Sequence, residues 1–302
     1  MNGGNSLEIE TIQDIIINSD MAVKVTTTGN IIEIMYKEKS SIGNNIKKLN
    51  ANEYIDISTG EIKEYKHTDN RSQSKNELRK TFKKIRDIIN CNVDKPNNCK
   101  WVTLTYAENM TDTKRLCKDV EKYIKRLRYK YGKFEFIQVA EPQGRGAWHI
   151  HMIMIFDRKA PYIDNKDMQD IWGYGFTNTR KLDDIDNLGA YLSAYLGDVS
   201  FDEINNDFAL IQKCLGKEVK QVDDKYYIKG GRLHLYPTGF NIYRCSRGVK
   251  RPVVEKMFEE QARKKVSAAT LTFQKTINIK DGDEFSNTIN YRYYNIKKCN
   301  DK

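Results

Sequence analysis

The sequence lacks the segments that would direct a protein into or across a membrane. No stretch of its 302 residues reaches the roughly 18 consecutive apolar residues that a membrane-spanning helix needs. The first residues, MNGGNSLEIE, carry acidic side chains and no apolar core, so they are not a signal peptide. The six cysteines form no C-x-x-C pair, which argues against a zinc site or a disulfide framework. We therefore expect a cytoplasmic protein with reduced thiols, with a Cys91–Cys99 bond as the alternative.

Acidic residues are fewer than basic ones. Lys and Arg number 51 against 41 Asp and Glu, which gives a net charge of +10 and a pI near 9.1. A balance of this sign favours an acidic partner, and nucleic acid is the commonest. A basic protein without any such partner is the alternative that charge alone leaves open.

Hydrophobic periodicity divides the chain into three expected domains. In residues 1–95, alternating segments around Gly29-Asn30 and Thr59-Gly60 predict hairpins, and helical spacing of apolar residues predicts a basic helix over residues 72–90. Residues 96–200 form the predicted central domain. Residues 201–302 form a basic and aromatic C-terminal region, expected to be an accessory or DNA-binding module. In this last span we expect a helix over 253–265 and a closing hairpin from 269–279 and 287–298.

The central domain predicts an α+β fold. Its elements follow in the order strand, helix, strand, strand, helix, strand, helix. This order suggests a central antiparallel sheet with helices on its faces, of the ferredoxin-like or RNA-recognition (RRM-like) type. The elements are expected at residues 100–106, 112–131, 134–140, 148–156, 165–172, 173–182 and 184–199.

Histidine is scarce, and half of the four histidines stand in one apolar segment, AWHIHMIMIF, residues 147–156. Residues two apart in a strand project from the same face, so His149 and His151 lie side by side. The other face must be core, and isoleucines continue the histidine face, so this strand is expected to be covered on both sides. The core face comprises Trp148, Ile150, Met152 and Met154, and the histidine face continues through Ile153 and Ile155.

Two adjacent buried histidines need hydrogen-bond partners for all their ring nitrogens. Core histidines satisfied by neighbours are one interpretation; a divalent cation, which satisfies both at once, is the other. Glu141 ends the preceding strand, and a tight turn would return the chain beside His149. A carboxylate with two imidazoles suits Mg²⁺ or Mn²⁺ at a site open to phosphate oxygens. Gly144 and Gly146 either let the backbone approach a ligand or only make the turn.

The segment GAYLSAYLGD places Tyr191 and Tyr195 four residues apart, on one face of the predicted helix. Packing is the usual role of such a pair. Beside a metal site in a basic domain, a phenol can instead attack a phosphodiester and hold the phosphate as a covalent ester. Two tyrosines would permit two successive transfers without hydrolysis.

The order WVTLTY, EPQGRGAWHIH and YLSAY resembles the HUH endonucleases, named for histidine–hydrophobe–histidine. It is more closely similar to rolling-circle replication initiators (Rep proteins) of Gram-positive plasmids and related phages or integrated elements. The resemblance covers residues 100–198. It implies that His149 and His151 bind the metal with Glu141 as third ligand.

The resemblance also implies an activity. A tyrosine, Tyr191 or Tyr195, nicks one strand at a DNA origin, takes the 5′-phosphate and leaves a free 3′-OH for polymerase. A host helicase and a DNA polymerase are the implied partners. Many relatives have a lysine three positions after the nucleophile; here that position is Ala194. If the first tyrosine of the pattern is the nucleophile, it is Tyr191.

Candidate DNA contacts follow from charge. Arg145 lies in the loop before the strand that carries His149 and His151, and we expect it to contact the scissile phosphate. Basic residues interleaved with aromatic ones after residue 228 have the composition of a surface for phosphates and stacked bases; a basic loop with packed aromatics is the alternative. This set comprises Lys229, Arg232, Arg244, Arg247 and Lys250, with Tyr236, Phe240 and Tyr243.

Other functions remain as alternatives. A conjugative relaxase or a single-strand transposase would use the same chemistry in another role. A non-catalytic DNA-binding protein on the same fold would want exposed aromatic residues on the sheet face and no paired histidines.

Overall fold

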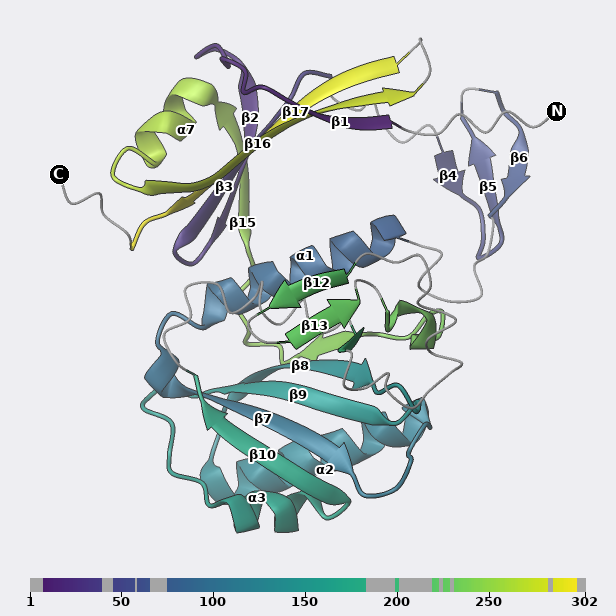
Figure 1. Ribbon diagram of the computed structural model, residues 1–302, viewed down its shortest axis with the longest axis vertical. Coiled ribbons are helices and arrows are strands. Elements are labelled where there is room, and N and C mark those ends of the chain that lie inside the picture. The colour runs from purple at the N-terminus through teal and green to yellow at the C-terminus, as the bar shows by residue number, and fades with distance from the viewer. Residues whose placement is uncertain are drawn as a thin grey trace. The chain divides into compact units, whose positions relative to one another are not determined.

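Strands from both ends of the chain pair with one another in a single six-stranded sheet. The computed structural model accordingly divides into two units, one of residues 1–67 with 252–302 and one of residues 68–251 (Figure 1). This division differs from the three consecutive domains expected from the sequence, because pairing between distant strands leaves no local signal. The structure describes residues 8–39, 46–57, 59–65, 75–182, 199–200, 219–222, 225–228, 231–281 and 285–297.

The six-stranded sheet belongs to the first unit and is antiparallel throughout. Its strand order is β1-β16-β17-β3-β2-β15. The hairpins predicted around Gly29 and from the C-terminal segments are confirmed as β2–β3 and β16–β17. The strands are β1 (Glu8–Ile12), β2 (Ala22–Thr28), β3 (Ile31–Lys37), β15 (Val253–Phe258), β16 (Thr270–Asp281) and β17 (Phe285–Asn295).

One prediction for this sheet was wrong in part. Residues 253–265 are not one helix: β15 takes the first six, and helix α7 (Glu259–Lys265) takes the rest. Pairing of β15 with β2 outweighs the helical spacing, and the β-branched Val253 and Val254 suit a strand.

Helix α7 covers one face of the six-stranded sheet. Its Ala262 and the residue that follows the helix, Val266, are buried in one cluster with apolar residues of β2 and β3. Beside that cluster, the Arg292 guanidinium donates to both carboxylate oxygens of Glu259 at 2.6 Å. The apolar sheet residues are Val23, Val25, Ile32 and Ile34.

A small antiparallel sheet follows in the chain, in the order β4-β5-β6. It confirms the hairpin predicted around Thr59-Gly60, where Gly60 has a positive φ of 74°. Its strands are β4 (Ile46–Lys48), β5 (Glu53–Asp56) and β6 (Ile62–Glu64).

The second unit is built on a five-stranded antiparallel sheet in the order β10-β7-β9-β8-β14. The six elements from β7 to β10 follow the predicted order, β7-α2-β8-β9-α3-β10, so the α+β class is confirmed. Helix α2 begins after Asp112, whose side chain accepts hydrogen bonds from the amides of Lys114 and Arg115. The elements are β7 (Cys99–Tyr106), α2 (Thr113–Tyr131), β8 (Glu135–Pro142), β9 (Trp148–Ile155), α3 (Asn165–Trp172), β10 (Gly175–Lys181) and β14 (Tyr243–Cys245).

Helices α2 and α3 cover one face of this sheet (Figure 1). Leu116 and Val120 of α2 line a small cavity with Ala140 and Ile150, whose side chains point to this face. The face carries Val102, Leu104 and Tyr106 of β7 and Ile150, Met152 and Met154 of β9, all buried in the main core of the unit.

Helix α1 (Lys75–Asn92) packs on the opposite face of the sheet, the face that carries the histidines. Its Ile89 lines a second small cavity with Trp101, Val139 and Ile153 of that face, and Asn92 fastens it by hydrogen bonds to both backbone polar groups of Lys250. The predicted two-sided burial of β9 is therefore confirmed. The basic helix, expected from the sequence to end an N-terminal module, clusters with the unit of residues 68–251.

The remaining described elements of the second unit are a three-stranded sheet and two short 3₁₀ turns. The sheet order is β11-β13-β12. All four cysteines in the described residues are free, as predicted, and no described helix is long and apolar enough to cross a membrane. These elements are η2 (Pro96–Asn98), β11 (Val199–Ser200), β12 (Val219–Val222), β13 (Lys225–Ile228) and η3 (Leu233–Leu235).

Candidate metal centre

The register of neighbouring strands brings Glu141, His149 and His151 together on one face of the five-stranded sheet. Glu141 of β8 is directly opposite His149 of β9, and His151 is two residues further along the same strand, so all three side chains share a face. One ligand atom from each residue lies within 4.8 Å of the other two. The structure thus confirms that His149 and His151 share one face of their strand and that a tight turn returns the chain beside Glu141.

The turn between β8 and β9 owes its shape to Gly146. Its φ is +86°, a backbone conformation that favours glycine. The Gln143 amide donates to the Ala147 carbonyl at 2.7 Å, and the Gly146 amide donates to the Gln143 carbonyl at 2.8 Å. Of the two roles considered for this glycine, the turn is the one that these contacts explain.

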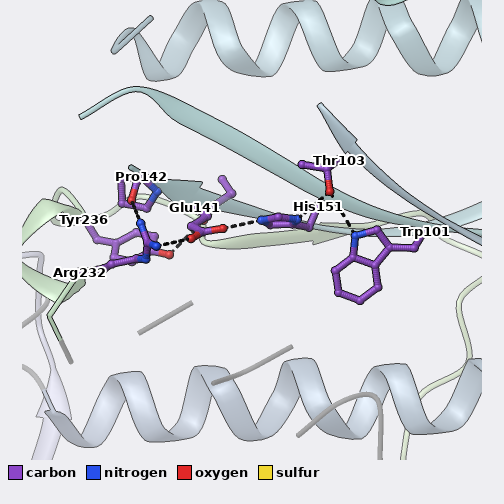
Figure 2. A network of polar contacts seen from close by, with 8 residues as sticks. Trp101, Thr103, Glu141, Pro142, His151, Arg232 and Tyr236 are labelled. Carbon is purple, nitrogen blue, oxygen red and sulfur yellow. Dashed lines mark hydrogen bonds and ion pairs between the residues drawn. The ribbon is translucent and has the colours of Figure 1, made fainter. Parts of the chain in front are cut away.

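Glu141 is held from two sides (Figure 2). One carboxylate oxygen contacts Nε2 of His151, and the other forms an ion pair of 3.0 Å with Nη2 of Arg232. Arg232 also donates from Nη1 to the Pro142 carbonyl at 3.0 Å. The carboxylate is therefore fixed at the middle of a polar chain across the sheet.

Burial favours the neutral form of Glu141, but its contacts outweigh that effect. The hydrogen bond from His151 and the positive charge of Arg232 favour the carboxylate, so the pKa of Glu141 lies below its ordinary value. Glu141 is therefore ionised at neutral pH and available as a metal ligand.

The ring of His151 is oriented by β7 (Figure 2). Its Nδ1 lies 3.2 Å from Oγ1 of Thr103, and that hydroxyl also accepts a hydrogen bond of 3.3 Å from Nε1 of Trp101. A metal-ligating imidazole usually uses its second nitrogen in such a contact. Thr103 was not among the site residues predicted from the sequence; pairing of β7 with β9, which sets Thr103 opposite His151, reveals its contact.

His149 is the residue whose surroundings fit a metal most directly. Its Nε2 is buried and has no hydrogen-bond partner among the described residues, whereas buried polar atoms are normally paired. Burial lowers the pKa of His149 to about 4, although Glu141 opposes the shift. The ring is therefore neutral at pH 7, and a lone pair on one nitrogen is free to bind a cation.

The donor set fits a divalent cation. Two imidazole nitrogens and one carboxylate oxygen converge, and the unpaired Nε2 of His149 would gain a partner from the ion. Glu141 and Arg232 cancel in charge, so a bound cation would leave the site positive and attractive to an anion. This arrangement could hold a metal against a phosphate group.

The structure places the predicted DNA contacts differently from one another. Arg145 is exposed in the turn beside the cluster, with Nε 3.2 Å from Oε1 of Gln143, and Arg247 and Lys250 are exposed after β14. Arg232 is only 4% exposed because it binds Glu141, so it cannot serve as a surface contact. Arg244 is opposite Gln138, on the face of α2 and away from the histidines, with Glu121 at 3.9 Å. Lys229 lies outside the described residues.

The aromatic residues of this region are largely packing residues. Tyr236 is fully buried and donates to the Ala140 carbonyl at 3.2 Å. Phe240 stacks on Trp148 at 4.6 Å between ring centroids. Tyr236 and Phe240 are therefore packing residues, as in the alternative of a basic loop with packed aromatics. Both rings pack against Trp148. Tyr243 is half-buried on β14.

The two candidate nucleophiles, Tyr191 and Tyr195, lie outside the described residues, as does the helix predicted around them. Their distance from the cluster therefore stays a prediction.

Part of the chain is similar to a known protein family. Residues 99–200 match the family model described as Replication-associated protein ORF2. The match begins at β7 and includes Glu141, His149 and His151, as well as both candidate tyrosines. No curated protein matches the chain. The similarity supports a link to DNA replication for this third of the sequence.

Proposed function

We propose that this chain is a metal-dependent DNA endonuclease and strand transferase that starts rolling-circle replication. The observation that carries the proposal is the Glu141–His149–His151 cluster, with its unpaired His149 nitrogen. The cluster lies inside the segment that matches a replication-associated family. The net charge of +10 suits a DNA substrate.

The proposed reaction is a transesterification. The phenol oxygen of Tyr191 or Tyr195 bonds to the scissile phosphorus, and the bond from phosphorus to the 3′ oxygen breaks. The phenol proton leaves, and the departing 3′ oxygen takes up a proton to become a free hydroxyl. One phosphoester replaces another, so the 5′-phosphotyrosine conserves the energy needed for a later strand closure. A second tyrosine would allow a second transfer.

The cluster residues take distinct roles in this proposal. Glu141, His149 and His151 would hold Mg²⁺ or Mn²⁺, which when bound would polarise the scissile phosphate. Arg232 positions Glu141 and compensates its buried charge. Thr103 fixes the ring of His151 so that Nε2 faces the cluster.

Arg145 is the proposed contact to the DNA backbone nearest the cluster. It is exposed, and its charge is one of those that oppose protonation of His149. Arg247 and Lys250 are proposed as further backbone contacts, since each is exposed on the same unit.

We propose that the sheet of β7 to β10 is a ferredoxin-like core. The element order β-α-β-β-α-β and the strand order β10-β7-β9-β8 are those of a split β-α-β arrangement. The unit of residues 68–251 would then carry catalysis, and the unit of both chain ends would be an accessory module. Host helicase and DNA polymerase are the proposed further partners.

The proposal is tested with labelled single-stranded oligonucleotides from the origin of the replicon that encodes the protein. Purified protein is incubated with them in Mn²⁺ or Mg²⁺, and denaturing gels resolve cleaved DNA and a covalent protein–DNA adduct. Parallel samples carry Tyr191→Phe, Tyr195→Phe and His149→Ala. Tyr129→Phe is the matched control, because Tyr129 is 96% exposed on α2 and away from the cluster.

We expect an adduct that requires metal, disappears with His149→Ala and disappears with one of the two tyrosine variants. Tyr129→Phe should behave as the unchanged protein. Binding without any adduct, on DNA known to contain the origin, would refute the enzyme proposal and favour a DNA-binding protein on this fold. An adduct that persists in both Tyr191→Phe and Tyr195→Phe would refute the assignment of the nucleophile.

A further inference from the structure

The six-stranded sheet of the first unit has one face that α7 does not cover. Side chains alternate along β2, and Val23 and Val25 are buried in the cluster with α7. Lys24, between them, therefore projects from the opposite face, which we call the lysine face.

The lysine face carries a row of side chains that crosses five strands. Lys275 of β16 is opposite Tyr291 of β17. Tyr291 is opposite Met35 of β3, and Met35 is opposite Lys24 of β2. Lys24 is opposite Lys256 of β15. Directly opposed residues share a face, and strands lie about 4.8 Å apart, so the row extends roughly 19 Å across the sheet.

The lysines of this row are not neutralised by the described residues of the unit. Lys24, Lys256 and Lys275 are exposed, and the salt bridges found there include none of them. Lys24 and Lys256 are like charges in directly opposed positions, which destabilises a sheet. Exposed Lys37 adds a fourth charge in the next row. The acidic residue on these rows, Glu33, is buried, with 5% exposure.

Aromatic rings lie beside the charges. The neighbouring row contains Phe273 and Tyr293 in opposed positions, with ring centroids 5.6 Å apart. Phe273 is 49% exposed although it is large and apolar. Val254, at the other end of this row, is 55% exposed. An unpaired basic row next to exposed aromatic surface is the combination that proteins use to bind backbone phosphates and stack unpaired bases.

We propose that the lysine face binds a single strand of nucleic acid, with the lysine row on its phosphates and Phe273 against its bases. Phosphates would separate the opposed charges of Lys24 and Lys256, which no described residue does. The choice of DNA over RNA rests on the proposed function. The preference for single-stranded over duplex nucleic acid rests on the lysine face alone. Duplex DNA would satisfy the lysines but would leave Phe273 without an accessible base.

The proposal is tested by fluorescence anisotropy on the full chain in a chelator, so that no cleavage contributes. The probes are a labelled mixed-sequence single strand of about 20 nucleotides, long enough for more than one typical binding site, and the same sequence as duplex. The test variant combines Lys24→Gln, Lys256→Gln and Lys275→Gln, and a second variant is Phe273→Ala.

A charge-matched control removes three lysines of the same unit that already have partners. Lys264, Lys265 and Lys280 form ion pairs with Glu260, Glu255 and Glu10, and all three become glutamine in the control. Far-UV circular dichroism and thermal melts check that each variant folds.

For the test variant we expect single-strand affinity to fall on the order of tenfold or more at moderate salt, and the slope of log affinity against log salt to fall by about 2. Phe273→Ala should weaken single-strand binding about fivefold or more and duplex binding little. Equal behaviour of the test and control variants would overturn the proposal. Equal losses on duplex and single strand, with no effect of Phe273→Ala, would overturn it in favour of a duplex surface.

The failure of this inference is distinguishable from failure of the proposed function. A metal-dependent adduct together with unchanged binding by the test variant would overturn only the lysine face. Weakened single-strand binding by the test variant, without any adduct on origin DNA, would support the lysine face and refute nicking.

Discussion

Metal-free protein should keep His149 neutral down to about pH 4. Burial is the largest cause, and the nearby positive charges of Arg232 and Arg145 add to it, so the pKa lies near 4 against an ordinary 6.5. Because the sequence has four histidines, their ring resonances can be followed individually by NMR in a chelator, and His149→Gln assigns the resonance.

The same shift makes the free energy of unfolding depend on pH. The unfolded chain binds a proton on His149 below pH 6.5, whereas the folded chain does not until pH falls to about 4. Stability is therefore lost as pH decreases through this window, by about 2 kcal/mol between pH 7 and pH 5. The loss belongs to His149, so it should be missing from His149→Gln.

Urea unfolding at pH 7 and pH 5 measures this change in the free energy of unfolding for the unit of residues 68–251. All three tryptophans, Trp101, Trp148 and Trp172, belong to the unit of residues 68–251, so their fluorescence reports its unfolding. A measured His149 pKa of 6 or above would refute the reasoning. An equal loss between pH 7 and pH 5 in the unchanged protein and in His149→Gln would refute it as well.

Three further outcomes are expected. Thr103→Val should lower Mn²⁺ affinity about 10- to 100-fold, measured by calorimetry, because His151 loses its orienting contact; an unchanged affinity would show that the contact is dispensable. Glu259→Gln leaves the Arg292 guanidinium buried beside a neutral group, so the first unit should lose about 3–5 kcal/mol, seen in circular dichroism but not in tryptophan fluorescence. Gly175→Ala should destabilise the second unit by about 2–3 kcal/mol, because a Cβ would lie 2.4 Å from the Thr105 carbonyl oxygen and the Ala107 amide nitrogen; a loss below about 0.5 kcal/mol would contradict this tight approach.

The sequence predicted that Glu141, His149 and His151 lie together because their geometry is local. His149 and His151 follow from strand alternation, and Glu141 follows from a short turn. Arg232 could not be found in this way: it meets Glu141 through a fold that brings together residues 90 positions apart, Arg232 and Pro142. Charge alone suggested that Arg232 contacts DNA, and only its burial shows a different partner.

The same limit explains the errors in the fold. Local patterns predicted the strands of the hairpins and the helices of the central domain. They could not show that β15 pairs with β2, because that pairing joins residues more than 200 positions apart, such as Val253 and Thr27. Helix α1 was predicted from local spacing, but its apolar face contacts a sheet that follows it in the chain, which local spacing could not show.

The sharing of one sheet by both chain ends has a consequence for synthesis on the ribosome. Strands β2 and β3 are made early, but β17, the strand next to β3, is made more than 200 residues later. At roughly 5–20 residues per second, the early hairpin waits on the order of tens of seconds for its neighbours. The unit of residues 68–251 is contiguous and can fold during that time. A chain that stopped before residue 253 would therefore contain the folded unit of residues 68–251 joined to a β2–β3 hairpin with both outer edges exposed, which is prone to aggregation.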